Sequence, residues 1–185
     1  MPLVLTNILD FAPIKLASRS YIEVVRGTPL LVQLFLIYFG LPSLGIKFDP
    51  MTASILALGL NSAAYQAEIF RSAIKGIPES QFLAAESLGF SKLQTFRYVV
   101  LPQSVRIAMP ALVNEFVTLI KESSLASIIG IVELTRRGDY VAAYTFRAFE
   151  AYLAVAIMYF ILCYFFSHTA RYIERKTRIP GYRGG

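Results

Sequence analysis

Three long stretches without a charged side chain limit how this chain can fold more than any other feature of its sequence. They are residues 27–46, 51–67 and 151–167. Each approaches the roughly 20 apolar residues that an α-helix needs to cross the hydrocarbon core of a bilayer. Only 16% of the residues are charged, which is too few to cover a water-soluble core with a polar surface. The sequence therefore predicts several membrane-spanning helices.

A fourth apolar stretch, residues 107–130, contains three ionisable side chains, Glu115, Lys121 and Glu122. Charged groups inside a membrane helix are costly, and they usually face the interior of a bundle rather than lipid. We therefore interpret this stretch as a fourth span whose polar side chains point inward. The expected fold class is all-α: a polytopic transmembrane helix bundle of about four spans, forming a single domain over residues 1–185.

The distribution of charge predicts the orientation of these spans. The formal net charge is +6, and basic residues gather before the first span, in residues 71–106 and after residue 167. Residues 41–50 and 131–150 carry equal numbers of both signs. Four spans with both termini in the cytoplasm place all three basic regions on that side, as the positive-inside rule requires. Membrane topology therefore explains the basic excess, and nucleic acid is not expected as a partner.

The connection between the second and third spans, about residues 76–104, contains signals for two short helices. Glu79 follows a proline, and an acidic residue suits the positive end of a helix dipole. Gly89 stands where a helix C-terminus favours a residue with positive φ. Ser91 and Gln94 have the spacing of a capping box, which starts a second helix. The pattern predicts a helix–glycine–helix loop on the cytoplasmic face.

Apolar and small side chains on this loop leave two interpretations open. Phe82, Leu93 and Phe96 are apolar residues in an otherwise solvated segment, and Ala84 and Ala85 allow another surface to come close. This pattern fits docking to a protein partner. It fits equally well an amphipathic hairpin that lies on the lipid surface.

The loop resembles the EAA motif of permeases in ABC importers, which reads E-A-A, three residues, Gly, nine residues, then I-x-L-P. Ala84, Ala85 and Gly89 match the small residues of the motif, and residues 99–102 read VVLP. Four further segments are similar to signatures of the polar amino acid subfamily. These are residues 23–33 (EVVRGTPLLVQ), 61–71 (NSAAYQAEIFR), 101–106 (LPQSVR) and 114–125 (NEFVTLIKESSL).

The resemblance implies a transporter of several subunits. In this family two permease chains, alike or different, pack together in the inner (cytoplasmic) membrane and bind a dimer of cytoplasmic ABC ATPases. An extracytoplasmic binding protein delivers the substrate, here a polar amino acid. The sequence lacks the G-x-x-x-x-G-K-[ST] pattern of a P-loop, so we expect ATP hydrolysis in the partner and no enzyme activity, cofactor or metal in this chain. The implied coupling residues are Leu83, Ala84, Ala85, Glu86, Gly89, Leu101 and Pro102.

Polar side chains within the spans are candidates for the substrate path. An amino acid carries both charges, and a buried site with both signs satisfies it. Structural roles stay open as well, because Glu68 and Arg71 have the spacing of an ion pair at a helix end, and Glu115 fits a contact between helices. The candidate path residues are Asn61, Gln66, Glu68, Glu115 and Lys121.

A proline near the start of the first uncharged stretch is expected to break or kink that helix, because proline removes a backbone donor. The segment Gly27, Thr28 and Pro29 is therefore interpreted either as a gating bend or as the start of a helix.

Two departures from the family pattern matter. Leu83 occupies the position of the motif's glutamate, and Glu86 lies one turn later. The subfamily typically has a further span before the matched region, and residues 1–13 are too short to form it. A truncated, non-transporting permease-like membrane partner is therefore an alternative. An intramembrane enzyme is a remote one, because His168 is the only histidine and no nucleophile motif accompanies it.

Overall fold

The computed structural model describes residues 12–177, and within this range it describes the side chains of residues 14–172. This part of the chain is built of helices and contains no strand, which confirms the predicted all-α class. The α-helices are α2 (Ala12–Arg26), α3 (Leu30–Phe35), α4 (Pro50–Lys75), α5 (Glu79–Ser87), α6 (Lys92–Thr95), α7 (Leu101–Glu122), α8 (Leu134–Thr145) and α9 (Ala148–Thr177).

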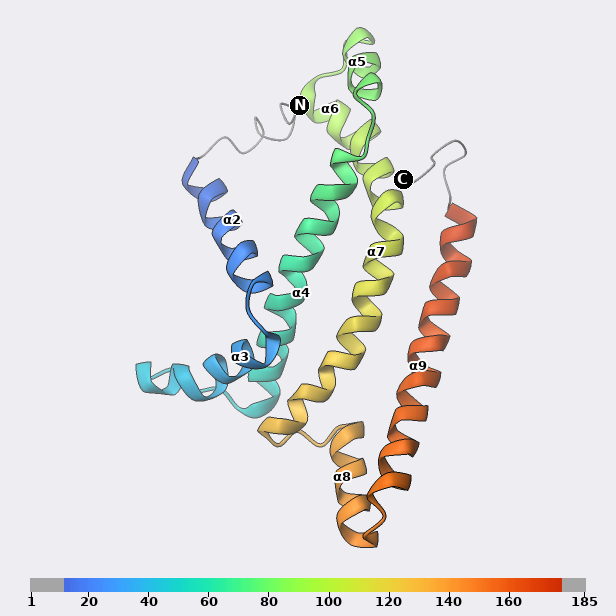
Figure 1. Ribbon diagram of the computed structural model, residues 1–185. Helices are drawn as coiled ribbons and strands as arrows, with labels where there is room; N and C mark the ends of the chain where they lie inside the picture. Colours follow the sequence, from blue (N-terminus) through green and yellow to red (C-terminus); the bar gives the residue numbers. More distant parts are fainter. Residues whose placement is uncertain (1–11, 178–185) are drawn as a thin grey trace.

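Helices α4 and α7 run antiparallel at the centre of the bundle, with α2 against α4 and α9 against α7 (Figure 1). Helices α5 and α6 lie at one end, whereas α3 and α8 lie at the other end. The packed face of α4 carries small residues, among them Ala53, Ala57 and Ala64, whose side chains are almost fully buried. Small residues let membrane helices approach closely, because lipid supplies no hydrophobic force that drives helices together.

One helix in the described range, Ala148–Tyr172 of α9, is long and apolar enough to cross a membrane by composition alone, with a mean hydropathy of 1.9. A bent pair, Ile14–Arg26 with Leu30–Leu44, meets the same criterion only if it is counted as one span. Helices α4 and α7 do not meet it, since they carry polar side chains, such as Asn61 and Glu115, that make contacts inside the bundle.

The first predicted span, residues 27–46, is not a straight helix, so this prediction is wrong in form. Helix α2 ends at Arg26, and the chain turns by 108° before the segment Leu30–Leu44. This segment passes from α3 through a π-helical turn (Leu36–Gly40) into a 3-10 turn (Leu41–Leu44). The residues before the break, predicted to precede the first span, form a helix of the bundle.

The boundaries of the third and fourth spans also differ from the prediction. Helix α7 occupies Leu101–Glu122, and a 3-10 helix (Ser123–Ile129) continues it to Gly130, which has a φ of +95°. The segment 131–150, predicted to be a polar loop, contains helix α8. Its first turn is capped by Glu133, whose carboxylate accepts the backbone N–H groups of Thr135 and Arg136, both at 2.8 Å.

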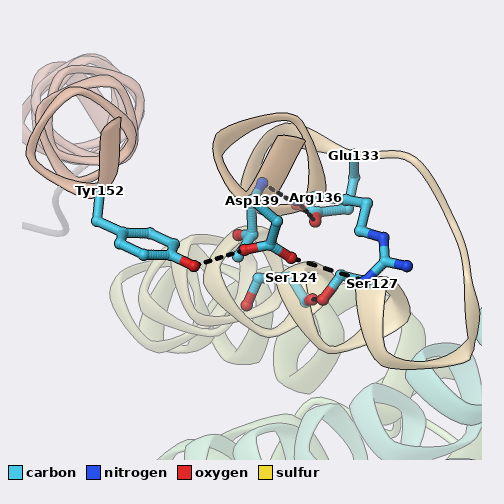
Figure 2. A network of polar contacts seen from close by, with 7 residues as sticks. Ser124, Ser127, Glu133, Arg136, Asp139 and Tyr152 are labelled. Atoms are coloured by element: carbon cyan, nitrogen blue, oxygen red, sulfur yellow. Dashed lines mark hydrogen bonds and ion pairs between the residues drawn. The ribbon is translucent and has the colours of Figure 1, made fainter. Parts of the chain in front are cut away.

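Helix α8 folds back onto α9 as a close hairpin (Figure 1), and polar side chains of the two helices meet (Figure 2). A Cβ atom at Gly138 would lie 2.5 Å from Cγ2 of Val155, so only glycine fits this crossing. The hydroxyl of Tyr152 on α9 donates to Oδ1 of Asp139 on α8 at 3.0 Å, and Arg136 lies 3.7 Å from the other oxygen of the same carboxylate. The hairpin is therefore held both by the close packing at Gly138 and by these polar contacts.

Candidate functional site

The α5–α6 loop, which we define as residues 76–100, has the predicted helix–glycine–helix form. Gly89 adopts a φ of +76° after the last turn of α5, and no atom lies near the space that a Cβ would occupy there. The backbone N–H of Phe90 donates to the carbonyl oxygen of Ala85 at 3.1 Å, which closes the end of the helix. Glycine is needed here for its left-handed conformation and not for space.

The predicted capping box at the start of α6 is confirmed. The N–H of Gln94 donates to Oγ of Ser91 at 3.3 Å, and the N–H of Ser91 donates to Oε1 of Gln94 at 2.8 Å. These two bonds satisfy backbone donors that the helix cannot pair by itself.

The second helix of the loop continues past Pro102. Helix α6 passes through a π-helical turn (Phe96–Val100) directly into α7, and Pro102 lies in the first turn of α7. The N–H of Leu101 donates to the carbonyl oxygen of Phe96, so helical hydrogen bonds run across this junction, and Pro102 removes one donor from them. Leu101 is partly exposed at the same junction.

The two motif alanines face opposite ways. Ala85 is only 3% exposed and packs against the rest of the chain, whereas Ala84 is exposed. Leu83 is 58% exposed, and Glu86 on the same helix is also exposed. Between α5 and α7 the side chain of Gln103 donates to Oε1 of Gln81 at 3.4 Å. The loop is therefore anchored on its inner face and presents its outer face without cover from the described part of the chain.

The break at Gly27, Thr28 and Pro29 is held by a residue for which the sequence predicted no role, Gln33. Its amide nitrogen donates to the backbone oxygen of Val25 at 2.7 Å, to that of Thr28 at 3.1 Å and to the Thr28 hydroxyl at 3.0 Å. The break is thus a bend and a helix start together, since Pro29 directly precedes α3.

Asn61 lies on α4 beside this bend. Its amide nitrogen donates to Oε1 of Gln33 at 3.1 Å, and its side chain is almost fully buried. This hydrogen bond ties the broken segment to the central helix α4.

Gln66 and Glu115 come together through Ser62, which the sequence did not single out. The Gln66 amide donates to the Ser62 hydroxyl at 3.1 Å, and this hydroxyl donates to Oε1 of Glu115 at 2.9 Å. The relay connects α4 to α7 and satisfies the Ser62 hydroxyl, as a buried polar group requires.

Glu68 lies between two arginines. Nε of Arg71, one turn later on α4, donates to Oε2 of Glu68 at 2.6 Å, and Nη1 of Arg26 from α2 lies 3.9 Å from Oε1. The Arg26 guanidinium also lies over the ring of Tyr65, 5.3 Å from its centroid. Charges of both signs therefore gather where α2 meets α4.

An open groove of about 360 Å³ adjoins this cluster. Its size falls within the range of small-molecule sites. Glu68 is the only one of the five candidate path residues that lines it. The lining comes from α2, α4 and α7 and consists of Arg26, Tyr65, Glu68, Ile69, Ser72, Ala73, Ile107, Ala108 and Ala111.

Lys121 does not join the other candidate path residues. Its side chain is exposed, and it makes no hydrogen bond or ion pair with the side chains that the structure describes. Its neighbour Glu122 lines a small cavity of about 10 Å³ among apolar residues of α3, α4 and the 3-10 helix that follows α7. The structure therefore brings Gln66 and Glu115 together, and places Asn61, Glu68 and Lys121 elsewhere.

Sequence reasoning missed four residues that organise these contacts, namely Arg26, Gln33, Ser62 and Tyr65. All four lie within residues 23–33 and 61–71, which had been noted only for their resemblance to family signatures. A polar side chain beside a helix break was the available signal for Gln33, because a break leaves backbone carbonyls to be paired.

Two structural features are those of a membrane permease. One is a helical bundle with a mixed-charge groove, and the other is an anchored helix–glycine–helix loop at one end of the bundle. A family model described as "Binding-protein-dependent transport system inner membrane component" matches residues 6–179. The chain belongs to this family.

Curated relatives are transport proteins. The chain is 44% identical to the probable amino-acid permease protein YxeN of Bacillus subtilis, over 88% of this chain and 74% of that protein. It is 42% identical to the glutamine transport system permease protein GlnP of Escherichia coli, over 86% of this chain and 74% of that protein.

A solved structure supports the same fold. It is described as an amino acid ABC transporter with histidines, and it matches with a TM-score of 0.88 and 44% identity, over 94% of this chain and 81% of that chain. The all-α bundle is therefore the fold of an ABC transporter permease.

Proposed function

We propose that this chain is the permease subunit of an ATP-driven importer that carries a polar amino acid across the cytoplasmic membrane. The observation that supports this most is the α5–α6 loop, which projects beyond the ends of α4 and α7 (Figure 1). The loop is anchored to α7 and leads into it without a break, so a partner that moves the loop also moves the bundle.

In this proposal the partners are a dimer of cytoplasmic ABC ATPases, a second permease subunit and an extracytoplasmic binding protein. The α5–α6 loop faces the cytoplasm, and so do both termini, because this orientation puts the basic regions inside. Chemistry of ATP hydrolysis belongs to the ATPase, and this chain supplies the loop and the groove.

The groove beside Glu68 is the proposed substrate path. Arg26 and Glu68 offer a cation for a carboxylate and a carboxylate for an ammonium group, and these are the two charges that every amino acid carries. Glu115 and Gln66 form a second polar position between α4 and α7, joined through Ser62. A charged substrate in a membrane protein needs such partners, because unpaired charge is costly there.

The test is uptake and ATP hydrolysis by the complex of this chain with its ATPase and binding protein, reconstituted in proteoliposomes and assayed with a panel of radiolabelled polar amino acids. We expect ATP-dependent uptake, and we expect Glu115→Gln to abolish it while basal ATP hydrolysis continues. Unchanged uptake by this variant would remove Glu115 from the path.

The same experiment tests the alternative of a non-transporting partner. The presence of Leu83 in place of the motif's glutamate favours this alternative. An assembled complex that hydrolyses ATP but takes up none of the amino acids in the panel would support that alternative over transport.

A further inference from the structure

Three exposed side chains form one stripe along α5: Glu79, Leu83 and Glu86. They are spaced by four and three residues, which places them on a single helix face. Phe82 and Ala85, in contrast, turn toward the chain itself and are partly or almost fully buried. The outward stripe therefore consists of a leucine between two glutamates.

Neither glutamate of the stripe is used within the chain. Among the ion pairs of residues 14–172, none includes Glu79 or Glu86, and neither side chain makes a hydrogen bond there. Leu83 leaves 58% of its surface open, although it lies on a helix that is otherwise well anchored. An uncovered leucine with unpaired carboxylates on either side has the form of an interface core with a charged rim.

The stripe also reverses the chemistry that the family motif would give. A glutamate at position 83 would call for a cation at the centre of the contact, whereas Leu83 calls for an apolar one. The negative charge is moved to the two ends of the stripe.

We propose that the ATPase subunit of this transporter receives α5 in a groove with an apolar pocket for Leu83, flanked by basic residues opposite Glu79 and Glu86. This inference rests on the proposed function, because it specifies the surface through which the loop couples. It makes the stripe a determinant of which ATPase the permease accepts, since an ATPase with a cation at the centre of its groove would leave that cation unpaired.

The test is the affinity of the full chain in detergent or nanodiscs for its candidate ABC ATPase, measured at several salt concentrations. Leu83→Glu should weaken binding by about 10-fold or more, because it places a charge in an apolar pocket. Leu83→Met should stay within about 3-fold, because it conserves volume and polarity.

The double variant Glu79→Lys with Glu86→Lys should weaken binding by about 10-fold and remove the salt dependence of the wild type, because rim charges act mainly through screened attraction. The matched control is Glu150→Lys, an exposed charge reversal at the opposite end of the bundle, which should leave the affinity unchanged. The stripe is exposed, so these variants should keep the Tm of the isolated chain.

A photoreactive benzoylphenylalanine at position 83 gives a second readout. Cross-linking to the ATPase, at a peptide that contains apolar and basic residues, is the expected result. Adducts with lipid instead of protein would overturn the proposal.

Different outcomes refute the coupling role of the loop and the apolar pocket for Leu83. If wild type binds the ATPase and Gly89→Asp loses it, but Leu83→Glu binds as tightly as wild type, the coupling loop stands and the apolar pocket is refuted. If wild type does not bind the ATPase at all, the coupling role itself is refuted, and the pocket with it.

Discussion

The α5–α6 loop and the groove between α2, α4 and α7 use their polar side chains in opposite ways. On the loop, the backbone is held by local capping bonds while the outer charges, such as Glu86, have no partner in the described chain. In the groove, Arg26 and Glu68 are already paired with each other across two helices. A substitution on the loop surface should therefore affect a partner, whereas a substitution in the groove should affect the fold and the substrate together.

Among changes to the groove and the loop, the largest effect should come from removing the negative charge of the groove. Glu68→Gln leaves Arg26 and Arg71 without their carboxylate and deprives a substrate ammonium group of its counter-charge. We expect uptake to fall by about 10-fold or more, as for loss of a hydrogen bond to a charged group. ATPase binding by the loop should stay normal, which would separate the two regions.

The control for this prediction is Glu23→Gln, which removes a carboxylate of α2 that does not line the groove. Its uptake should stay within about twofold of wild type, as for most surface substitutions. Equal losses in the two variants would show that net charge, and not the groove, matters.

A smaller effect should follow from distorting the loop backbone. Gly89→Asp forces a side chain onto a φ of +76°, at a cost of about 1–2 kcal/mol, so we expect about 10-fold less ATPase retained on co-purification. Gly89→Asn is the matched variant, because asparagine tolerates this conformation better, and it should retain more ATPase than the aspartate variant. Equal retention by wild type and Gly89→Asp would mean that the turn does not position the docking helix.

Removing the hydrogen bonds of Gln33 at the bend should have a smaller effect, limited to the stability of the fold. Gln33→Leu removes the hydrogen bonds to Val25, Thr28 and Asn61, each worth about 0.6 kcal/mol in a membrane bundle. We expect the Tm in detergent to fall by several degrees, as measured by a thermal shift of the purified chain. A Tm equal to wild type would show that the break at Pro29 holds without Gln33.

The smallest effect should come from the cap of α4. The Thr52 hydroxyl and then the N–H groups of Thr52 and Met51 donate to the carboxylate of Asp49, and these bonds lower the pKa of Asp49. A lowered pKa in the folded state stabilises the fold above the unfolded value, and this contribution is lost as the pH falls through the folded pKa. Asp49→Ala should therefore lower the Tm slightly at neutral pH and abolish this part of its decline in acid.

The loop could be predicted from sequence because the residues that specify its backbone act locally. Gly89 and the pair Ser91 and Gln94 act within a few residues of one another, and their backbone requirements do not depend on the rest of the fold. The continuity of α6 with α7 could not be predicted, because a proline such as Pro102 usually marks a helix boundary, whereas here a π-helical turn carries the helix past it.

The polar contacts between the helices could not be predicted because they join distant parts of the chain. Gln33 and Asn61 are separated by 28 positions and Ser62 and Glu115 by 53, and no local pattern shows which side chains will meet. Helix α8 was missed for another reason. Its mixed charges and the interior Gly138 weaken a helical pattern, while the packing that stabilises this helix comes from Val155 on α9.

The π-helical turn at Phe96–Val100 joins α6 directly to α7, so a rotation at this junction is transmitted along α7. The 22 residues of α7, with Pro110 in the helix interior, extend about 33 Å from the point where this turn ends. A tilt of one degree about the turn displaces the far end of such a helix by about 0.6 Å, so ten degrees correspond to about one helical pitch. In the proposed orientation, the junction thus converts a small rotation at the cytoplasmic surface into a large displacement at the far end of α7.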